Sequence, residues 1–574
     1  MSYTHTIRTL TLSLAALLVV TLTGCQDLSV ENENSPDRSQ VLAAPEDIEG
    51  LASGTFLDFW SATQWCGQSM MLSTMADAHS CSWANWGMQD MASEPRIAWN
   101  NNPAYSRAAS NETPWFQNYV AISNASDVLR AIENTDAAAF ESADVDVARM
   151  EAFVNFTMGL AYGHIAATYD RAFLVDETTD AEGVATGAVE LNLEPYPAVA
   201  DFAISKLDRA IQIASNNDFT IPSEEDWIFG LTVTSDDLVQ LANSFKARYA
   251  AMTARTPSER QSLGHVNASW GDVITWIDNG VTDTFAPIGD DSGATEWDCQ
   301  KFYGQDGATW SRADYRTIGP ADESGGYENW LDTPVAQRVP YETQTRDRRI
   351  ASADGGDGKD FSSEGVEFTA FPVERGSYHY SDRTPTMYVE YLDNIANGPM
   401  PHLTIEEMNL LKAEALLHTG GPNGDVADLI DLTRVDIGEL PTAAGAPVGS
   451  ISDEPNPLAP GDVTLWSMLK YEFGIETMLT SAGLNYFTDR GWGDLVQGTP
   501  LHFPVPGQEL QTLGVQIYTF GGQEGPCAAG VDTNCEAPSA GGSNAMKVAG
   551  GFNMGNIWKA GDQPVRAPRP SQPK

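Results

Sequence analysis

The chain has 574 residues, and its 32 Lys and Arg against 79 Asp and Glu give a formal net charge of −47. So acidic a protein repels nucleic acid and anionic lipid headgroups, both of which bind basic surfaces, and these two classes of partner are excluded. Its hydrophobic content of 42% is ordinary for a globular fold.

The first residues have the pattern of a secretory signal. His5 and Arg8 precede an apolar run over 10–22, and small Gly24 stands directly before Cys25. The run has about 13 residues, whereas a membrane-spanning helix needs about 20. We therefore predict a lipoprotein signal peptide over 1–24, a lipid-bearing Cys25 and a polar stalk over 25–44. An uncleaved anchor helix is the alternative.

Apolar residues recur at helical spacing through much of the chain, and no later stretch is long and apolar enough to span a bilayer. The expected helices cover 45–60, 114–133, 145–169, 196–214, 235–255, 404–418, 425–435 and 464–487. Alanine is frequent on their apolar faces, which suits helices that pack closely as antiparallel pairs. No strict 34-residue repeat is present, so a regular array is not indicated.

The spacing divides the mature chain into four regions. A region of helical pairs over 45–278 precedes a loop-rich region over 279–401, where Gly, Pro, Asp and Ser are dense and aromatic residues have no period. Long irregular stretches are usually functional or disordered, and the aromatics argue against disorder. A C-terminal helical region over 402–497 contains an irregular insertion at 440–460, and 498–574 is rich in Gly and Pro.

The cysteines other than Cys25 fit an exported protein, in which disulfides are permitted. Proximity in the sequence predicts the bridges Cys66–Cys81 and Cys527–Cys535, and leaves Cys299 as a buried thiol. Zinc is the rival interpretation, but the chain has no C-x₂-C pair and no His beside a cysteine pair at ligand spacing.

Motifs of catalysis are missing from the sequence, which contains no G-x-S-x-G, no H-E-x-x-H and no P-loop. Acidic residues are so abundant that a glycosidase carboxylate pair cannot be identified. The run Asp354 to Asp360 has a spacing that allows calcium, but it lacks the final Glu of an EF-hand loop, and a solvated turn is the simpler interpretation. The basic island 346–349 is expected to pair with local carboxylates. We therefore expect no enzyme activity, no cofactor and no metal.

Several segments together resemble the SusD/RagB family of nutrient-uptake lipoproteins. The early Asp-Ile-Glu-Gly at 47–50 follows the stalk, as at the start of that family. The other matching segments are 152–171 (AFVNFTMGLAYGHIAATYDR), 410–416 (LLKAEAL), 428–438, 471–494 (YEFGIETMLTSAGLNYFTDRGWGD) and 503–510 with its Pro-Val-Pro and Glu-Leu. Two features depart from the family: the Gly and Pro expected near Arg171, and the Q-N-P-G-Y signature, are absent.

The resemblance implies a tetratricopeptide-like superhelix of helical pairs with a loop-rich ligand-binding face. It also implies a lipoprotein of the cell outer membrane, exposed at the cell surface. The partner would be a TonB-dependent barrel of the SusC type, and the cargo an oligosaccharide or, in some branches, a peptide.

Aromatic residues suggest where such a ligand binds, because sugar rings present flat C–H faces that stack on aromatic planes. Loop residues are the better candidates, since tryptophans on helices, such as Trp60 and Trp115, more often belong to the core. The predicted ligand-binding residues are Trp83, Asn85, Trp86, Tyr303 and Trp310. Two alternatives to a binding protein stay open: a lipoprotein glycoside hydrolase that uses carboxylates, and a helical scaffold that binds only proteins.

Overall fold

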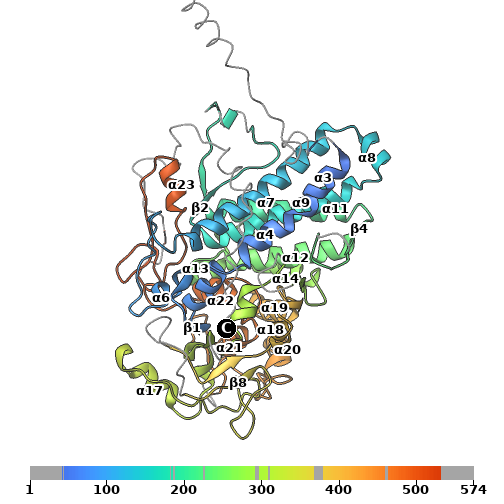
Figure 1. Cartoon of the computed structure of the whole chain (residues 1–574). Helices are drawn as coiled ribbons and strands as arrows, with labels where there is room; N and C mark the ends of the chain where they lie inside the picture. Colours follow the sequence, from blue (N-terminus) through green and yellow to red (C-terminus); the bar gives the residue numbers. More distant parts are fainter. Residues whose placement is uncertain are drawn as a thin grey trace, which may run out of the picture.

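The computed structural model describes residues 42–535, apart from residue 43 and the segments 181–182, 185, 187, 224–226, 291–295, 308–309, 367–378, 459–462 and 532–534. Helices dominate the described residues, and the strands are short (Figure 1). The expected mainly α class is confirmed. The predicted signal peptide and Cys25 lie outside the described residues. Within the described residues, no helix has both the length and the apolar character needed to cross a membrane.

The first half of the chain supplies the longer helices. They are α3 (Pro45–Ser53), α4 (Thr55–Thr63), α5 (Gln68–Met75), α6 (Met88–Met91), α7 (Ala109–Asn134), α8 (Ala137–Ala143), α9 (Val147–Thr168), α11 (Tyr196–Ala214), α12 (Ser235–Met252), α13 (Pro257–Ser262) and α14 (Trp270–Asp278). The expected helix over 45–60 is two helices, because the chain turns at Gly54, and the helix expected from Pro114 begins five residues earlier.

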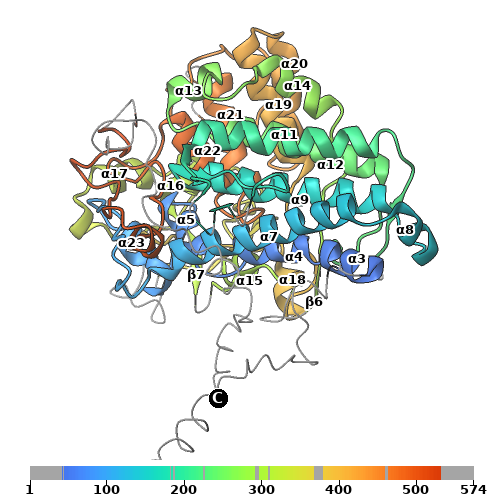
Figure 2. The same cartoon turned by 90° about the horizontal axis from the view of Figure 1, so that it is seen from above.

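Helix α9 is the centre of the first layer. It packs against α7 and α11, and α11 packs in turn against α12 (Figure 2). Nearly all of α9 is buried, as expected for a helix that is apolar on every side. Two glycines allow the close approach: a Cβ at Gly159 would lie 2.6 Å from Leu207 Cγ, and one at Gly163 would lie 2.3 Å from Tyr249 Cε2.

The second half adds short helices in the loop-rich region and a C-terminal helical group. They are α15 (Cys299–Tyr303), α16 (Tyr315–Ile318), α17 (Gly326–Asp332), α18 (Val389–Asp393), α19 (Ile405–Thr419), α20 (Asn423–Arg434), α21 (Leu465–Glu476), α22 (Leu484–Trp492) and α23 (Gly507–Thr512). Helix α14 links α12 to α19, which packs on α20 and α21. The single helix expected over 464–487 is wrong, because the chain adopts positive φ at Leu479 and Gly483 and restarts as α22.

Short strands pair segments of the chain, some of them close in the sequence and others far apart. The described strands are β1 (His79–Cys81), β2 (Arg171–Phe173), β3 (Leu193–Pro195), β4 (Thr220–Ile221), β5 (Val233–Thr234), β6 (Ile288–Asp290), β7 (Ser311–Ala313), β8 (Phe361–Ser363), β9 (Arg383–Pro385) and β10 (Asn397–Pro399). They form the antiparallel pairs β1–β7, β2–β3, β4–β5, β6–β10 and β8–β9. The β1–β7 pair joins the N-terminal helical region to the loop-rich region.

A buried arginine closes the ends of two helices. Arg490 on α22 donates to the carbonyls of Ala167 (2.8 Å), Met252 (2.6 Å), Ala254 (3.1 Å) and Leu501 (2.9 Å). The last carbonyls of a helix lack intrahelical partners and carry a partial negative charge. The guanidinium therefore offsets the partial negative charge at the C-terminal ends of α9 and α12 and hydrogen-bonds their carbonyls. Its bond to the Leu501 carbonyl also holds the chain at that residue against both helices.

Buried ion pairs connect the two helical groups. The Arg248 guanidinium donates to Glu407, and the Arg260 guanidinium donates to Glu414 at 2.7–2.8 Å. The arginines of the basic segment 346–349 lie in two different places. Arg346 pairs with Glu323 at the surface. Arg349 is fully buried and contacts Asp347, Glu472 and Glu476. Arg349 thereby ties the loop-rich region to α21.

The disulfides differ in part from expectation. Cys66 is bonded to Cys299, with a Cα–Cα distance of 5.1 Å, and Cys81 is a free, buried thiol. The expected Cys66–Cys81 bridge and the free Cys299 are therefore wrong, because packing places the start of α15 beside Cys66, where the Cys299 amide donates to the Gln64 carbonyl at 3.1 Å. The structure does contain the expected Cys527–Cys535 bridge.

A buried carboxyl on α23 makes the stability depend on pH. Glu509 is 5% exposed, and burial raises its pKa to about 7. An unfolded glutamate titrates near pH 4.3, so this group's contribution to stability is complete below that pH and is lost as the pH rises through about 7. We expect Glu509→Gln to raise the free energy of unfolding by about 2–3 kcal/mol at pH 8 and hardly at all at pH 4.5.

Urea titrations at the two pH values measure this difference. Glu141→Gln, at an exposed position on α8, serves as the matched control and should change stability little at either pH. An equal effect of Glu509→Gln at both pH values would show that the carboxyl does not titrate as stated.

Candidate ligand-binding site

The β1–β7 pair brings two predicted ligand-binding residues together. His79 lies opposite Ala313, Ser80 opposite Arg312 and Cys81 opposite Ser311. The ladder continues one step further, because the Ser82 amide donates to the Trp310 carbonyl at 2.8 Å. Trp83 and Trp310 are 227 positions apart in the sequence. They nevertheless lie next to each other, at the same end of this strand pair.

Four aromatic rings meet at this end of the ladder, and we call them the aromatic cluster: Trp83, Trp86, Tyr303 and Trp310. Trp83 is central, with its ring centroid 5.3 Å from that of Trp86, 4.8 Å from that of Tyr303, and in edge contact with Trp310. The three tryptophans are half-buried, Tyr303 is buried, and Asn85 is exposed beside them. All five predicted ligand-binding residues thus lie in one place.

Trp86 has an unusual backbone conformation, with φ 54° and ψ 14°. A bulky residue seldom adopts the left-handed region, and such strain is concentrated at functional sites. The following Gly87 also has positive φ, and a Cβ there would lie 3.1 Å from Met71 Sδ and 3.2 Å from Trp99 Cζ3. Only glycine fits easily at 87, and the tight turn directs Trp86 toward Trp83.

Helix α15 places Tyr303 in the cluster. Asp298 caps the helix by accepting from the Lys301 amide, and the Lys301 ammonium donates to Asp298 at 2.9 Å and to the Thr480 carbonyl at 2.6 Å. Burial and the nearby Asp306 carboxylate raise the pKa of Tyr303. The phenol is therefore neutral at physiological pH and suited to hydrogen bonding.

Other aromatic residues surround the cluster. Phe302 and Trp297 contact Tyr303, with ring centroids 5.1 Å and 6.0 Å away. Sequence reasoning missed Phe302 as a site residue, although its position next to Tyr303 was a signal. Trp60 and Trp115 belong to the core, as expected, and the Trp60 indole donates to the Trp297 carbonyl at 2.9 Å.

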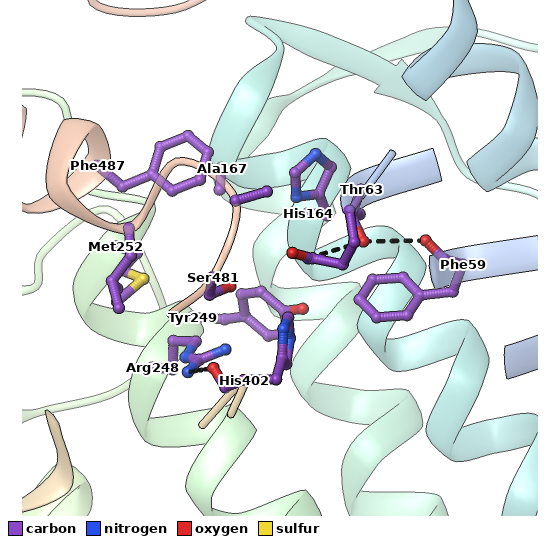
Figure 3. Close-up of a pocket in the computed structure, with 13 residues that line it drawn as sticks. Phe59, Thr63, His164, Ala167, Arg248, Tyr249, Met252, His402, Ser481 and Phe487 are labelled. Carbon is purple, nitrogen blue, oxygen red and sulfur yellow. Dashed lines mark hydrogen bonds between the residues drawn. The ribbon is translucent and has the colours of Figure 1, made fainter. Parts of the chain in front are cut away.

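A separate internal cavity lies between α4, α9, α12 and α22 (Figure 3). It measures about 20 Å³, enough for one water molecule, and His164, Arg248 and His402 face it. Burial, with Arg248 nearby, holds the pKa of His402 well below its usual range, so its ring is neutral. A sugar ring does not fit in this cavity, and the aromatic cluster is the better candidate site.

The described residues also group His502, Cys527 and Cys535 within metal-ligand distance of one another. The two sulfurs are joined in a disulfide, so they are not available as thiolate ligands. In the calcium-like run, Asp354 accepts from the Ser352 hydroxyl and Asp357 accepts from the Ser363 amide. These contacts are those of ordinary turns.

No protein-family model matches the sequence, and no curated protein matches it. Solved structures do match the fold. A SusD superfamily protein from Bacteroides fragilis aligns over 82% of this chain and 98% of its own, with 14% identity and a TM-score of 0.51. One from Parabacteroides distasonis aligns over 81% and 97%, with 12% identity and a TM-score of 0.51. The chain has the SusD fold.

The segments that resemble the family lie in helices of this fold and supply buried residues that hold it together. The segment 152–171 forms most of α9, and the LLKAEAL segment lies in α19, where Glu414 holds Arg260. The segment 471–494 spans α21 and α22 and contributes Glu472, which holds Arg349, and the helix-closing Arg490. None of these three side chains belongs to the aromatic cluster.

Proposed function

We propose that this chain is a non-catalytic lipoprotein that captures oligosaccharides at the aromatic cluster. The observation that carries the proposal is the convergence of Trp83, Trp86, Tyr303 and Trp310 from two distant segments, with the Asn85 amide exposed at the edge. Half-exposed indoles offer faces for sugar C–H groups, and an amide can both donate to and accept from hydroxyl groups.

The size of the cluster is consistent with useful affinity. One stacked sugar face contributes about 1–2 kcal/mol at roughly 25 cal/mol per Å² of apolar surface. Micromolar binding corresponds to about −8 kcal/mol. Two or three platforms and several hydrogen bonds are therefore needed, and a cluster of this kind supplies the platforms. The same rings can hold aromatic or proline-rich peptides, so peptides belong in the test.

Delivery forms the second part of the proposal. We infer that acyl chains on Cys25 hold the protein on the outer membrane, exposed at the cell surface, and that it passes its cargo to a TonB-dependent barrel of the SusC type. The signal-like start of the sequence and the SusD fold support this part. Mass spectrometry of Cys25, together with co-purification of a barrel with the native lipoprotein, tests it.

Calorimetric titration of a protein spanning 26–574 tests capture. The probes are neutral hexasaccharides of glucose, xylose and mannose in α and β linkage, and a set of hexapeptides. We expect at least one hexasaccharide to bind with a micromolar Kd and to be recovered uncleaved. Cleavage abolished by a single carboxylate substitution would favour a hydrolase. Peptide binding alone would change the cargo, and binding of neither class would contradict capture.

A further inference from the structure

The bridge between Cys66 and Cys299 joins the two chain segments that build the aromatic cluster. Cys66 lies between α4 and α5, in the segment that leads through β1 to Trp83. Cys299 is the first residue of α15, which ends at Tyr303. The two cysteines are 233 positions apart, and their Cα atoms are 5.1 Å from each other.

Two hydrogen bonds hold the same junction. The Cys299 amide donates to the Gln64 carbonyl at 3.1 Å, and the Trp60 indole donates to the Trp297 carbonyl at 2.9 Å. These bonds and the disulfide fix the start of α15 on the α4–α5 connection. Helix α15 also packs directly on α5.

Helix α15 depends on these attachments. It has five residues, and so short a helix is unstable in isolation because its nucleation is unfavourable. Its start is held by the disulfide, and Lys301 holds its middle through the Thr480 carbonyl. Tyr303 follows Cys299 by about one helical turn, so movement at Cys299 is carried directly to the Tyr303 ring.

We infer that the Cys66–Cys299 disulfide is a positioning element of the ligand site, which keeps Tyr303 in contact with Trp83. This inference rests on the proposed function. The bridge acts at the base of the cluster: one cysteine precedes the segment that supplies Trp83, and the other begins the helix that supplies Tyr303.

The free thiol of Cys81 lies in the same part of the chain, and it does not readily exchange with this disulfide. Cys81 lies on β1, two residues before Trp83, and burial raises the pKa of its thiol to about 12. Disulfide exchange requires a thiolate, so a thiol with this pKa is a poor attacker at neutral pH. The third cysteine of this part of the molecule therefore does not compete for the pairing.

The second disulfide provides a matched control within the same chain. Cys527 and Cys535 are eight positions apart, and Cys535 lies beside His502 in the C-terminal segment. We compare Cys66→Ser/Cys299→Ser with Cys527→Ser/Cys535→Ser. Each variant removes one bridge and two sulfurs, but only the first touches the junction below the cluster.

Two readouts are measured on folded protein, as checked by far-UV circular dichroism. The first is the Kd for the neutral hexasaccharide panel. The second, which needs no ligand, is the near-UV circular dichroism of the packed indoles. We expect Cys66→Ser/Cys299→Ser to weaken binding about tenfold and to reduce the near-UV signal. The control variant should keep the wild-type Kd within about twofold.

Equal Kd values and equal near-UV spectra for the two folded variants would overturn the inference. If wild-type protein binds no member of the panel, the proposed function fails, while the near-UV comparison still decides whether the bridge positions the rings. If the first variant does not fold, the control variant is treated with a phosphine reductant under native conditions. Only Cys66–Cys299 then remains to open, and an unchanged Kd and spectrum after opening would contradict the inference.

Discussion

Replacing Trp83 with alanine is expected to weaken hexasaccharide binding by about 10- to 100-fold, or roughly 1.5–3 kcal/mol. Trp83 contacts the other three rings of the aromatic cluster. Its removal takes away one platform and also releases the Trp86 and Trp310 rings from their packing. A loss at the upper end of the range follows if both effects are felt. Calorimetric titration with the neutral panel measures the change.

Trp276→Ala is the matched control for Trp83→Ala. Trp276 is a half-buried tryptophan on α14, where it packs against the Lys246 ammonium, 4.4 Å from the ring centroid. Its loss should leave the hexasaccharide Kd within about twofold of wild type. Wild-type affinity in Trp83→Ala, with a normal far-UV spectrum, would remove the aromatic cluster from consideration as the binding site.

Arg490→Met is expected to lower the free energy of unfolding by about 4 kcal/mol or to prevent folding, because each buried polar group left without a partner costs about 1–3 kcal/mol. The carbonyls of Met252, Ala254 and Leu501 lose this donor, whereas the Ala167 carbonyl keeps a second donor in buried Arg255 at 2.9 Å. The ends of α9 and α12 lose one of the two guanidinium charges that face them. Methionine fills much of the same space but supplies no donor.

Urea titrations followed by far-UV circular dichroism measure the effect of Arg490→Met. Arg490→Lys keeps the charge but has fewer donors and no planar fork. It should therefore lower the free energy of unfolding by about half as much as Arg490→Met does. The control is Arg209→Met, which removes a surface pair with Glu151 at a side chain that is 47% exposed; it should cost less than about 1 kcal/mol. If the Arg490→Met variant were as stable as wild type, the carbonyls of Met252, Ala254 and Leu501 would be shown to find other partners.

The segments that resemble the SusD/RagB family contribute buried charged residues to the packing of this chain. Glu414, Glu472 and Arg490 are fully buried and each satisfies a charged or polar group on another element. Loss of one partner from such a contact is costly, since the other is left buried and unpaired. Exposed polar side chains carry no such cost, because water satisfies them.

Helices were predictable because their signals are local. Apolar spacing predicted both ends of α11 correctly, and it predicted the ends of α9, α19 and α20 to within two residues. The breaks at Gly54 and between α21 and α22 were missed. At both places apolar residues continue at helical spacing through the turn, so the spacing gives no signal that one helix ends and another begins.

The sequence alone determined the helical class, the acidic surface and the residue types of the site, because these depend on composition and on neighbours a few positions away. Only the tertiary structure decided that Cys66 bonds Cys299 and that Trp83 meets Tyr303 and Trp310. These pairings span more than 200 positions. They are set by how α5, α15 and the β1–β7 ladder pack together, and no local pattern of residues records that arrangement.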